Sequence, residues 1–355
     1  MGRQRECWET PNLGDPKLSL SLLLGIAPKI AGVHLSCRQA FSVKRRALVC
    51  WLPMAWLSDV ALATESNGGN IAVLYPQIGE PYRSIFAAIL QGIEDQSRGR
   101  VVNVPVVDGP SLADLTADLH RKGVKAVIAL GRAGLNLAAQ LKGQWPVVMG
   151  CVLSLPEAHL AMGQVLSLAP DPALLFARLK TLMPAVRRVD VVYDPRQNEW
   201  LIRLARDAAR SQGLELVVRE AQDLKAAVRQ YRDLFQTVDP RRDALWLPQD
   251  SSTVDEAVVL PMVLEESWSR SLAVFSSSMV HVRRGALFAL YPDNAGMGRQ
   301  LARMVQPYLA GDAPVEDGIA PLRDLLLAVN TRTAHHLGVD LDSSRLRFDM
   351  IFPEP

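Results

Sequence analysis

The sequence predicts an α/β protein of two Rossmann-like lobes, each built on a parallel sheet, with a cleft between the lobes. Three observations predict this fold class. Along residues 70–330, short apolar runs alternate with amphipathic segments of helical period. The alternation starts again after residue 165, which gives two series of similar length. No low-complexity linker separates the series, which favours several chain crossings over one flexible tether.

The first series begins with a buried strand at 71–75, an apolar run bounded by glycines and by Pro76. Pro81 opens a helix over 82–97, where apolar residues recur every three or four positions. The other predicted elements are strands at 101–107, 125–130 and 146–149, a helix that Ser111 caps, and a helix at 133–141. Strands joined by helices over so short a span predict a parallel, doubly wound sheet.

The second series predicts a crossover strand at 166–169 and a helix that Asp171-Pro172 opens. Further strands are predicted at 188–193, 214–218, 244–247 and 272–275, and further helices at 198–212, 226–235 and 254–268. Later segments complete both lobes: a strand at 286–290, a helix at 297–309 and a last strand at 325–329. We therefore assign residues 64–165 plus about 280–312 to lobe 1, and 166–279 plus about 313–345 to lobe 2.

Residues 1–63 are predicted to be a leader with a signal peptide whose core lies at about 44–63. A basic triplet at 44–46 precedes an apolar run at 47–57, and Ala61-Leu62-Ala63 supplies a small-x-small cleavage site. The run is shorter than a stable membrane span. A second apolar run at 18–26, a buried N-terminal helix, and a lipid anchor at Cys37 or Cys50 are the alternatives. The prediction is an exported protein that keeps one cysteine, Cys151.

Composition and charge exclude several classes of function. With 355 residues, 49% of them hydrophobic, the chain is long enough for two folded domains. Its formal net charge is +2, from 39 Lys and Arg against 37 Asp and Glu. No strong field therefore attracts nucleic acid, and no helix-turn-helix precedes residue 70, so no nucleic-acid partner is expected.

Short motifs follow one another in a fixed order along residues 70–340. They are Pro81-Tyr82, Gln91-Gly92-Ile93, Val127-Ile128-Ala129-Leu130-Gly131, Pro146-Val147-Val148, Leu182-Met183-Pro184, Gly285-Ala286-Leu287, Gly298-Arg299-Gln300-Leu301-Ala302 and Val329-Asn330-Thr331-Arg332-Thr333-Ala334. In this order they resemble the substrate-binding proteins of ABC-type uptake systems, whose better-known members bind tryptophan or related amino acids. The resemblance implies the type I periplasmic binding protein architecture. It also implies a periplasmic location, a membrane permease as partner, and binding of a small molecule without catalysis.

One residue departs from the pattern of that family. After the Gly131 that ends the third predicted strand, the family usually carries a small or hydroxyl residue, and here the chain carries Arg132. A long cation at a strand end is expected to face the cleft. The identity of the ligand therefore remains open, with an amino acid as one candidate. The alternative functions are a carrier of an apolar ligand and a sensor that reports its ligand to a receptor.

Ligands of open α/β sheets bind beyond the carboxyl ends of the strands, where helix N-termini present free N–H groups. This rule gives the candidate binding residues Gln77, Tyr82, Gly131, Arg132, Ala133, Tyr193, Asn198, Asp250, Ser251, Ser276 and Ser277. Several have structural alternatives: Ser251 with Ser252 as a helix cap, Asp250 as a turn residue, and Arg132 as a solvated rim residue. Tyr82 either stacks on a ligand ring or covers the cleft.

No catalytic, metal or cofactor site is predicted. The chain lacks the motifs of nucleophile elbows, phosphate-binding loops and zinc proteases. Adjacent His335-His336 diverge on a helix and cannot share one metal ion, and Cys151 is expected to be a small buried residue. Gly296-Met297-Gly298 is expected to serve helix packing or capping. Six aromatic residues near strand ends or helix starts favour the apolar-ligand alternative: Tyr82, Phe86, Tyr193, Trp246, Phe275 and Tyr291. A monomer is expected.

Overall fold

A computed structural model of the chain describes residues 69–106, 111–141, 143–153, 163–311, 318–342, 344 and 346–354. The predicted leader and its cleavage site lie outside these residues, as do Cys7, Cys37 and Cys50. In the part of the chain that is described, no helix is both long and apolar enough to cross a bilayer.

The first lobe is built on a six-stranded sheet in the order β11-β5-β4-β3-β1-β2, with every neighbouring pair parallel. Its strands are β1 (Asn70–Pro76), β2 (Val101–Val106), β3 (Val124–Leu130), β4 (Val147–Val152), β5 (Gly163–Pro170) and β11 (Ile319–Leu322). Apolar residues of α2 (Tyr82–Ser97) and α11 (Asn294–Ala310) form a core with one face. On the other face, α3 (Leu112–Arg121) and α4 (Gly131–Gln140) form a second core.

The second lobe is built on a seven-stranded sheet in the order β13-β12-β10-β9-β8-β6-β7. Its strands are β6 (Arg188–Tyr193), β7 (Glu215–Glu220), β8 (Asp243–Leu247), β9 (Ala273–Ser276), β10 (Phe288–Pro292), β12 (Leu325–Asn330) and β13 (Met350–Phe352). Only the β10–β12 pairing in it is antiparallel.

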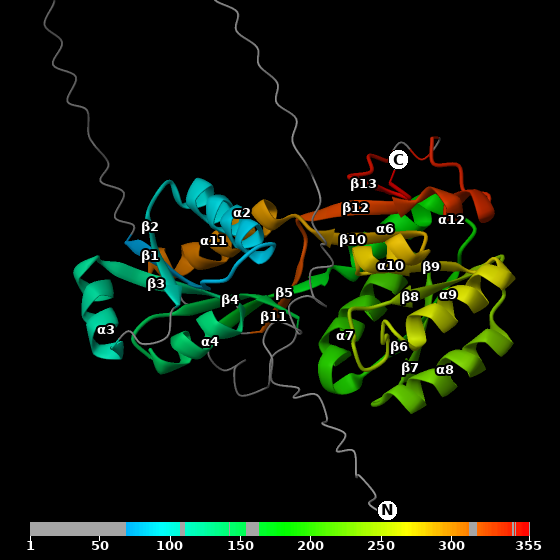
Figure 1. Ribbon diagram of the computed structural model, residues 1–355, viewed down its shortest axis with the longest axis horizontal. Coiled ribbons are helices and arrows are strands. Elements are labelled where there is room, and N and C mark those ends of the chain that lie inside the picture. Colours follow the sequence, from blue (N-terminus) through cyan, green and yellow to red (C-terminus); the bar gives the residue numbers. More distant parts are fainter. Residues whose placement is uncertain are drawn as a thin grey trace, which may run out of the picture.

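Helices cover both faces of this second sheet. The core on one face contains apolar residues of α6 (Pro172–Leu182) and α7 (Pro195–Ser211). The core on the other face contains those of α8 (Leu224–Thr237), α9 (Val259–Arg270) and α10 (Met279–Arg284). The short helix α12 (Thr331–His336) follows β12. Figure 1 shows the two lobes side by side. The predicted α/β architecture with two mostly parallel sheets is confirmed.

Three segments of the chain connect the lobes. The chain passes from β5 of the first sheet to α6 of the second lobe, from β10 back to α11, and from β11 forward to β12 (Figure 1). Since β5 runs parallel to its neighbours, the carboxyl edge of the first sheet faces the second lobe. In the second sheet, β10 runs parallel to β9, and hence to β8 and β6, and the chain passes from the end of β10 to the first lobe. The carboxyl ends of β6, β8 and β9 therefore also point toward the first lobe. The two carboxyl edges therefore face each other at the junction of the lobes.

The observed boundaries differ from the expected ones at several points. Residues from about 280 were assigned to lobe 1, whereas α10 packs on the second sheet, β10 belongs to it, and the chain returns to the first lobe only after Pro292. Residues from about 313 were assigned to lobe 2, whereas β11 pairs with β5 in the first sheet. Both β9 and β10 are buried apolar runs, so hydrophobicity does not show which sheet a strand joins. The short strands β11 and β13, of four and three residues, were not predicted.

The first lobe depends on close contact between α2 and α11. A Cβ atom on Gly298 would lie 2.1 Å from the backbone oxygen of Ile89, and one on Gly92 would lie 2.0 Å from that of Ala295. The helices approach so closely that only glycine fits at these two positions. The expected packing role of the glycines around Met297 is confirmed.

We predict that Gly298→Ala destabilises the protein by about 1–3 kcal/mol, because its new methyl group must displace backbone rather than a flexible side chain. Urea unfolding followed by circular dichroism measures the change. Gly79→Ala is the matched control, since a Cβ atom there has no neighbour within 4 Å. Equal unfolding midpoints for the two variants would contradict the proposed packing constraint.

Candidate functional site

The candidate residues of the first lobe lie at the carboxyl ends of β1 and β3. Gln77 is exposed in the loop after β1, and Tyr82 is half-buried at the start of α2. Gly131, Arg132 and Ala133 form the first turn of α4, which follows β3 without a loop. The direct turn from strand to helix requires a φ of +64° at Gly131, a conformation that favours glycine.

Arg132 places an exposed guanidinium at the edge that faces the second lobe. It belongs to the first turn of a ten-residue helix, whose N-terminal N–H groups carry partial positive charge. A guanidinium beside a helix N-terminus attracts a carboxylate or another anion, and it can bind both of its oxygens. Among the described residues of the first lobe, this turn is the arrangement best suited to an anionic group.

In the second lobe, Asp250 holds two loops together. Its Oδ2 accepts hydrogen bonds from the backbone N–H of Asp194 at 2.8 Å and from Nδ2 of Asn198 at 2.9 Å. Its Oδ1 accepts from the backbone N–H groups of Ser252 at 3.0 Å and Thr253 at 3.2 Å. Asp250 is 4% exposed, and its carboxylate accepts two bonds at each oxygen. Asp250 and Asn198 therefore organise the loops after β8 and β6, and their role as ligand contacts stays a prediction.

Arg196 extends this network to the loop after β7, although the sequence analysis did not select it. Its guanidinium donates to both carboxylate oxygens of Asp194 and, through Nη2, to the backbone oxygen of Gln222. Hydrogen bonds from Arg196 hold the pKa of Asp194 below its usual value. The one available indication was an arginine two residues after a helix-capping aspartate. The carboxyl ends of three neighbouring strands are thereby tied together.

Ser276 and Ser277 lie inside the second lobe, at the end of β9. The Ser276 hydroxyl donates to the backbone oxygen of Leu247 at 3.0 Å and lies 2.7 Å from Nδ1 of His281. With its hydrogen engaged by Leu247, the hydroxyl accepts from an Nδ1–H tautomer of His281. Ser277 Oγ accepts from the indole N–H of Trp246 at 3.2 Å. Both serines are buried and stabilise the end of the strand, and their contact with a ligand stays a prediction.

The alternative role of Ser251 and Ser252 as helix caps is wrong. Helix α9 begins only at Val259, and Asp255 accepts from the N–H groups of Ala257 and Val258 just before it. Ser251 is exposed, and Ser252 accepts a hydrogen bond from Nε2 of Gln197 at 3.0 Å. The turn centred on Asp250 therefore delays the helix beyond the start that the apolar pattern predicted.

Most of the aromatic residues near strand ends belong to the lobe cores. Phe86, Tyr193, Trp246 and Phe275 are all buried. The Tyr193 hydroxyl donates to Glu199 at 2.7 Å and lies 3.3 Å from Glu220, and burial raises its pKa above the usual value. These four side chains pack within the protein, so they no longer support an apolar ligand.

Cys151 is buried and the consecutive pair His335-His336 is helical, as the sequence predicted. Cys151 is buried at the end of β4, and burial raises the pKa of its thiol to about 12, which keeps it protonated near neutral pH. Within the described ranges, no three His, Cys, Asp or Glu residues are grouped as a metal site. His336 instead stacks on Trp268 with ring centroids 3.9 Å apart.

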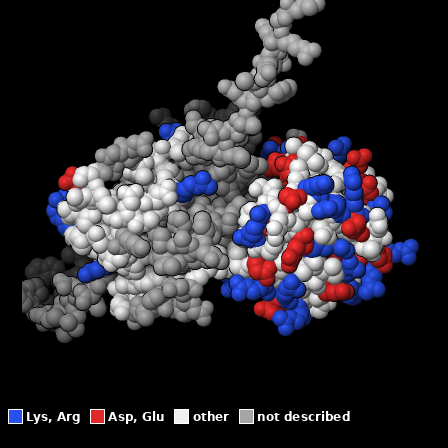
Figure 2. Space-filling view, turned by 90° about the horizontal axis from the view of Figure 1, so that it is seen from below, with Lys and Arg blue, Asp and Glu red and all other residues white. Residues whose placement is uncertain are grey.

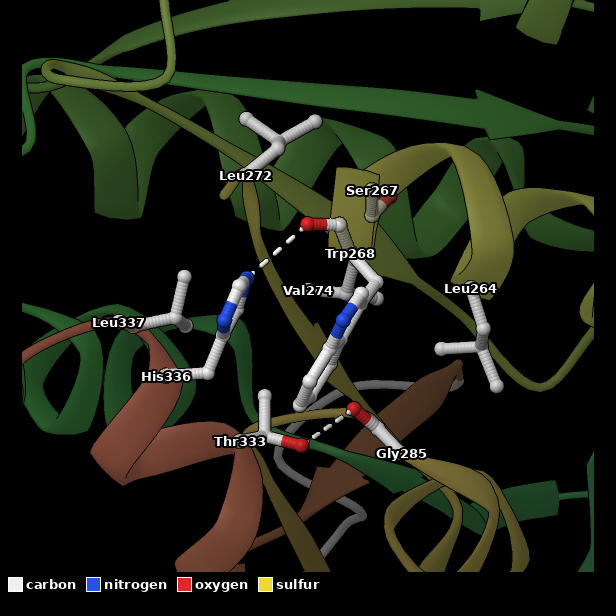
Figure 3. Close-up of a pocket in the computed structure, with 9 residues that line it drawn as sticks. All are labelled: Leu264, Ser267, Trp268, Leu272, Val274, Gly285, Thr333, His336 and Leu337. Atoms are coloured by element: carbon white, nitrogen blue, oxygen red, sulfur yellow. Dashed lines mark hydrogen bonds between the residues drawn. The ribbon is translucent and has the colours of Figure 1, made fainter. Parts of the chain in front are cut away.

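A small pocket surrounds this stacked pair (Figure 3). It is lined by Leu264, Ser267, Trp268, Leu272, Val274, Gly285, Thr333, His336 and Leu337. Leu272 and Val274 lie at the amino end of β9, and α12 follows the far end of the antiparallel strand β12. The pocket therefore lies at the opposite edge of the second sheet from the junction of the lobes.

The surface charges differ between the lobes. Figure 2 shows Lys, Arg, Asp and Glu closely mixed over the second lobe, and few charged residues on the described surface of the first. No extended area of one sign is visible on this face. The view agrees with the small net charge of the sequence.

Comparisons with known proteins find a family match for part of the chain. Residues 176–347 match the family described as ABC transporter substrate binding protein. The matched range contains most of the second lobe together with α11 and β11 of the first. The predicted resemblance is confirmed over this range. Among curated proteins, none matches the sequence.

Solved structures resemble the chain at low sequence identity, and the one with a TM-score above 0.5 has the same fold. The substrate binding protein CD0873 of Clostridium difficile, in a ligand-free, open structure, is 15% identical with a TM-score of 0.54, over 79% of this chain and 98% of that one. An ABC domain from Streptococcus pneumonia in complex with L-Trp is 18% identical with a TM-score of 0.46, over 79% and 100%. A conserved domain protein of Vibrio cholerae is 18% identical with a TM-score of 0.47, over 80% and 99%.

We predict that Asp250→Ala lowers the free energy of unfolding by about 3 kcal/mol, because it leaves several buried donors without an acceptor. Ser251→Ala, at the exposed neighbouring position, should change it by less than about 0.5 kcal/mol. Urea unfolding of both variants measures the difference. An Asp250→Ala variant as stable as the parent would show that the carboxylate does not organise the loops.

Stability should also depend on the protonation of His281. Burial, with a smaller contribution from Arg284, lowers the pKa of His281 from 6.5 to about 4. The unfolded chain therefore binds the proton first as the pH falls, and this contribution to stability is present above pH 6.5 and lost toward pH 4. It amounts to about 2 kcal/mol between pH 7 and pH 4.5.

The variant His281→Asn should lose this part of the pH dependence while it keeps a donor toward Ser276. Unfolding free energies at pH 7 and pH 4.5 measure the difference, and His335→Asn, at an exposed position, is the control. Parallel pH profiles for the parent and His281→Asn would contradict the assignment.

Proposed function

We propose, from the premise that residues 176–347 carry the pattern of ABC transporter substrate binding proteins, that this chain binds a small molecule between its lobes and presents it to a membrane permease. The proposal includes location outside the cytoplasmic membrane, in the periplasm, where such a protein meets its permease. Binding would exclude water by hinge motion of the lobes, and the resulting closed form would be the one that the permease recognises.

The observation that carries this proposal is the pair of carboxyl edges that face each other at the junction of the lobes. Parallel sheets bind ligands beyond their carboxyl ends, and here two such edges face each other. Three short crossings connect the lobes and allow them to move about a common axis. A molecule held from both sides would shift the population toward a closed form in proportion to its preference for that form.

We infer that the ligand carries an anionic group, with an amino acid as the first class to test. Arg132 and the first turn of α4 supply the positive charge. In the second lobe, Asp250 already accepts four hydrogen bonds, so an ammonium group would have to replace some of them. The anionic end of the ligand is therefore the one for which the described residues supply an available partner.

We predict that the full chain shows a thermal shift with one or more small carboxylates in a panel of amino acids, other organic anions, sugars and lipids. A ligand at about 100 times its Kd adds roughly 2.7 kcal/mol of stability. Arg132→Gln should weaken binding of that ligand about tenfold, because a charge-assisted bond is lost. Titration calorimetry measures the Kd.

Arg121→Gln is the matched control, since Arg121 is an exposed arginine at the end of α3 that pairs with Asp118 in the same helix. If only lipids bind, the apolar-carrier alternative replaces the amino-acid proposal. If an anion binds equally well to Arg132→Gln and to the parent, Arg132 is a solvated rim residue.

A further inference from the structure

The crossing segments between the lobes are held by one face of α11. Arg299 Nη2 lies 3.2 Å from Asp293 Oδ2, just after β10. Arg303 Nη2 donates to Asp324 Oδ2 at 2.9 Å, between β11 and β12. Because α11 packs against α2 in the first lobe, these ion pairs fix two of the three crossings to that lobe.

The crossings also contact one another. The backbone N–H of Asp293 donates to the oxygen of Asp324 at 3.1 Å, and that of Asp171 donates to the oxygen of Leu322 at 2.9 Å. All three crossings therefore form a single hydrogen-bonded group. A change in the angle between the lobes must pass through it.

One side-chain pair in this group connects the two lobes. The backbone N–H of Arg323 donates to Oε1 of Gln300 on α11, at 3.3 Å, which ties Arg323 to the first lobe. Its side-chain Nε donates to Asp171 Oδ2 at 2.9 Å. Through Oδ1, Asp171 caps α6 of the second lobe by accepting from the N–H of Ala173 at 2.9 Å.

We propose that this Arg323–Asp171 pair, which we call the hinge ion pair, restrains the angle between the lobes and so sets the balance of conformations before any ligand binds. The Asp171 side chain is 10% exposed and that of Arg323 is 73% exposed. Such a half-exposed pair contributes only a modest free energy. A modest contribution suffices, because the conformations of a hinged binding protein differ little in free energy.

This step rests on the proposed function: in a chain that binds a ligand between its lobes, the pair controls ligand affinity without contacting the ligand. The apparent Kd of a protein whose competent form is partly populated scales with the inverse of that population. Loss of the pair redistributes the populations and leaves the contacts at Arg132 unchanged. Arg323 is therefore a positioning residue for the motion of the lobes.

The test measures interlobe distances by double electron–electron resonance on the full chain without ligand. Spin labels are attached at Gln140→Cys on α4 and Gln236→Cys on α8, both exposed positions in different lobes. Cys7, Cys37 and Cys50 are replaced by serine in every sample. Buried Cys151, with a pKa raised to about 12, does not react.

In Arg323→Gln, we expect the fraction of molecules outside the main distance peak to rise roughly two- to five-fold. Asp171→Asn should behave alike, since asparagine still caps α6 but carries no charge. Arg323→Lys should restore a narrower distribution. Arg121→Gln is the control, because it removes an arginine whose ion pair lies within the first lobe. Circular dichroism melts confirm that every variant is folded.

Distance distributions of folded Arg323→Gln and Asp171→Asn that match the parent would overturn the proposal. Because the measurement uses no ligand, this outcome is separable from a failure of the proposed function. A widened distribution in a protein that binds no small molecule would support the hinge ion pair and contradict the transport proposal.

Discussion

The direction in which β5 and β10 leave their sheets determines the rest of this structure. Each strand runs parallel to a neighbour in its sheet and ends where the chain crosses to the other lobe. Parallel strands place all their carboxyl ends on one edge, so one crossing strand orients the whole edge. The loops that carry Arg132 and Asp250 consequently lie at the same junction, although they come from separate sheets. Reversal of either strand would move its loops to the far edge.

Burial at that junction imposes a second requirement. Strand ends and helix starts leave backbone N–H groups without partners, and a buried donor must find an acceptor. In the second lobe this acceptor is the carboxylate of Asp250, which satisfies loops after β6 and β8 at once. A carboxylate used in this way fixes the loop geometry. It thereby shapes the wall of the proposed binding site, and a ligand group that contacted it would have to replace some of these hydrogen bonds.

The same chemistry explains what the sequence could and could not predict. Apolar periodicity located the longer strands and helices, and hence the parallel sheets, because burial on both faces leaves a continuous apolar run. It missed β11 and β13, which are too short to show a period. The rule that ligands bind beyond the carboxyl ends of strands correctly placed Ser276 and Asp250 at strand ends. It could not show that the Ser276 hydroxyl already donates to Leu247, because Leu247 is distant in the sequence. Nor could it show that the Asp250 carboxylate already accepts from Thr253, because that bond depends on the turn geometry.

The two lobes thus contribute different properties to the junction. The second lobe supplies a pre-formed wall in which Arg196 pairs with Asp194 and the carboxylate of Asp250 accepts N–H groups of the neighbouring loops. The first supplies an exposed cation, Arg132, on a short turn. A rigid wall whose polar groups are already hydrogen-bonded would cost little reorganisation when a ligand arrives, and an exposed charge would supply attraction and selectivity for the sign of the ligand. Selectivity would then depend mainly on the first lobe, and affinity would depend on how readily the hinge brings the second lobe against it.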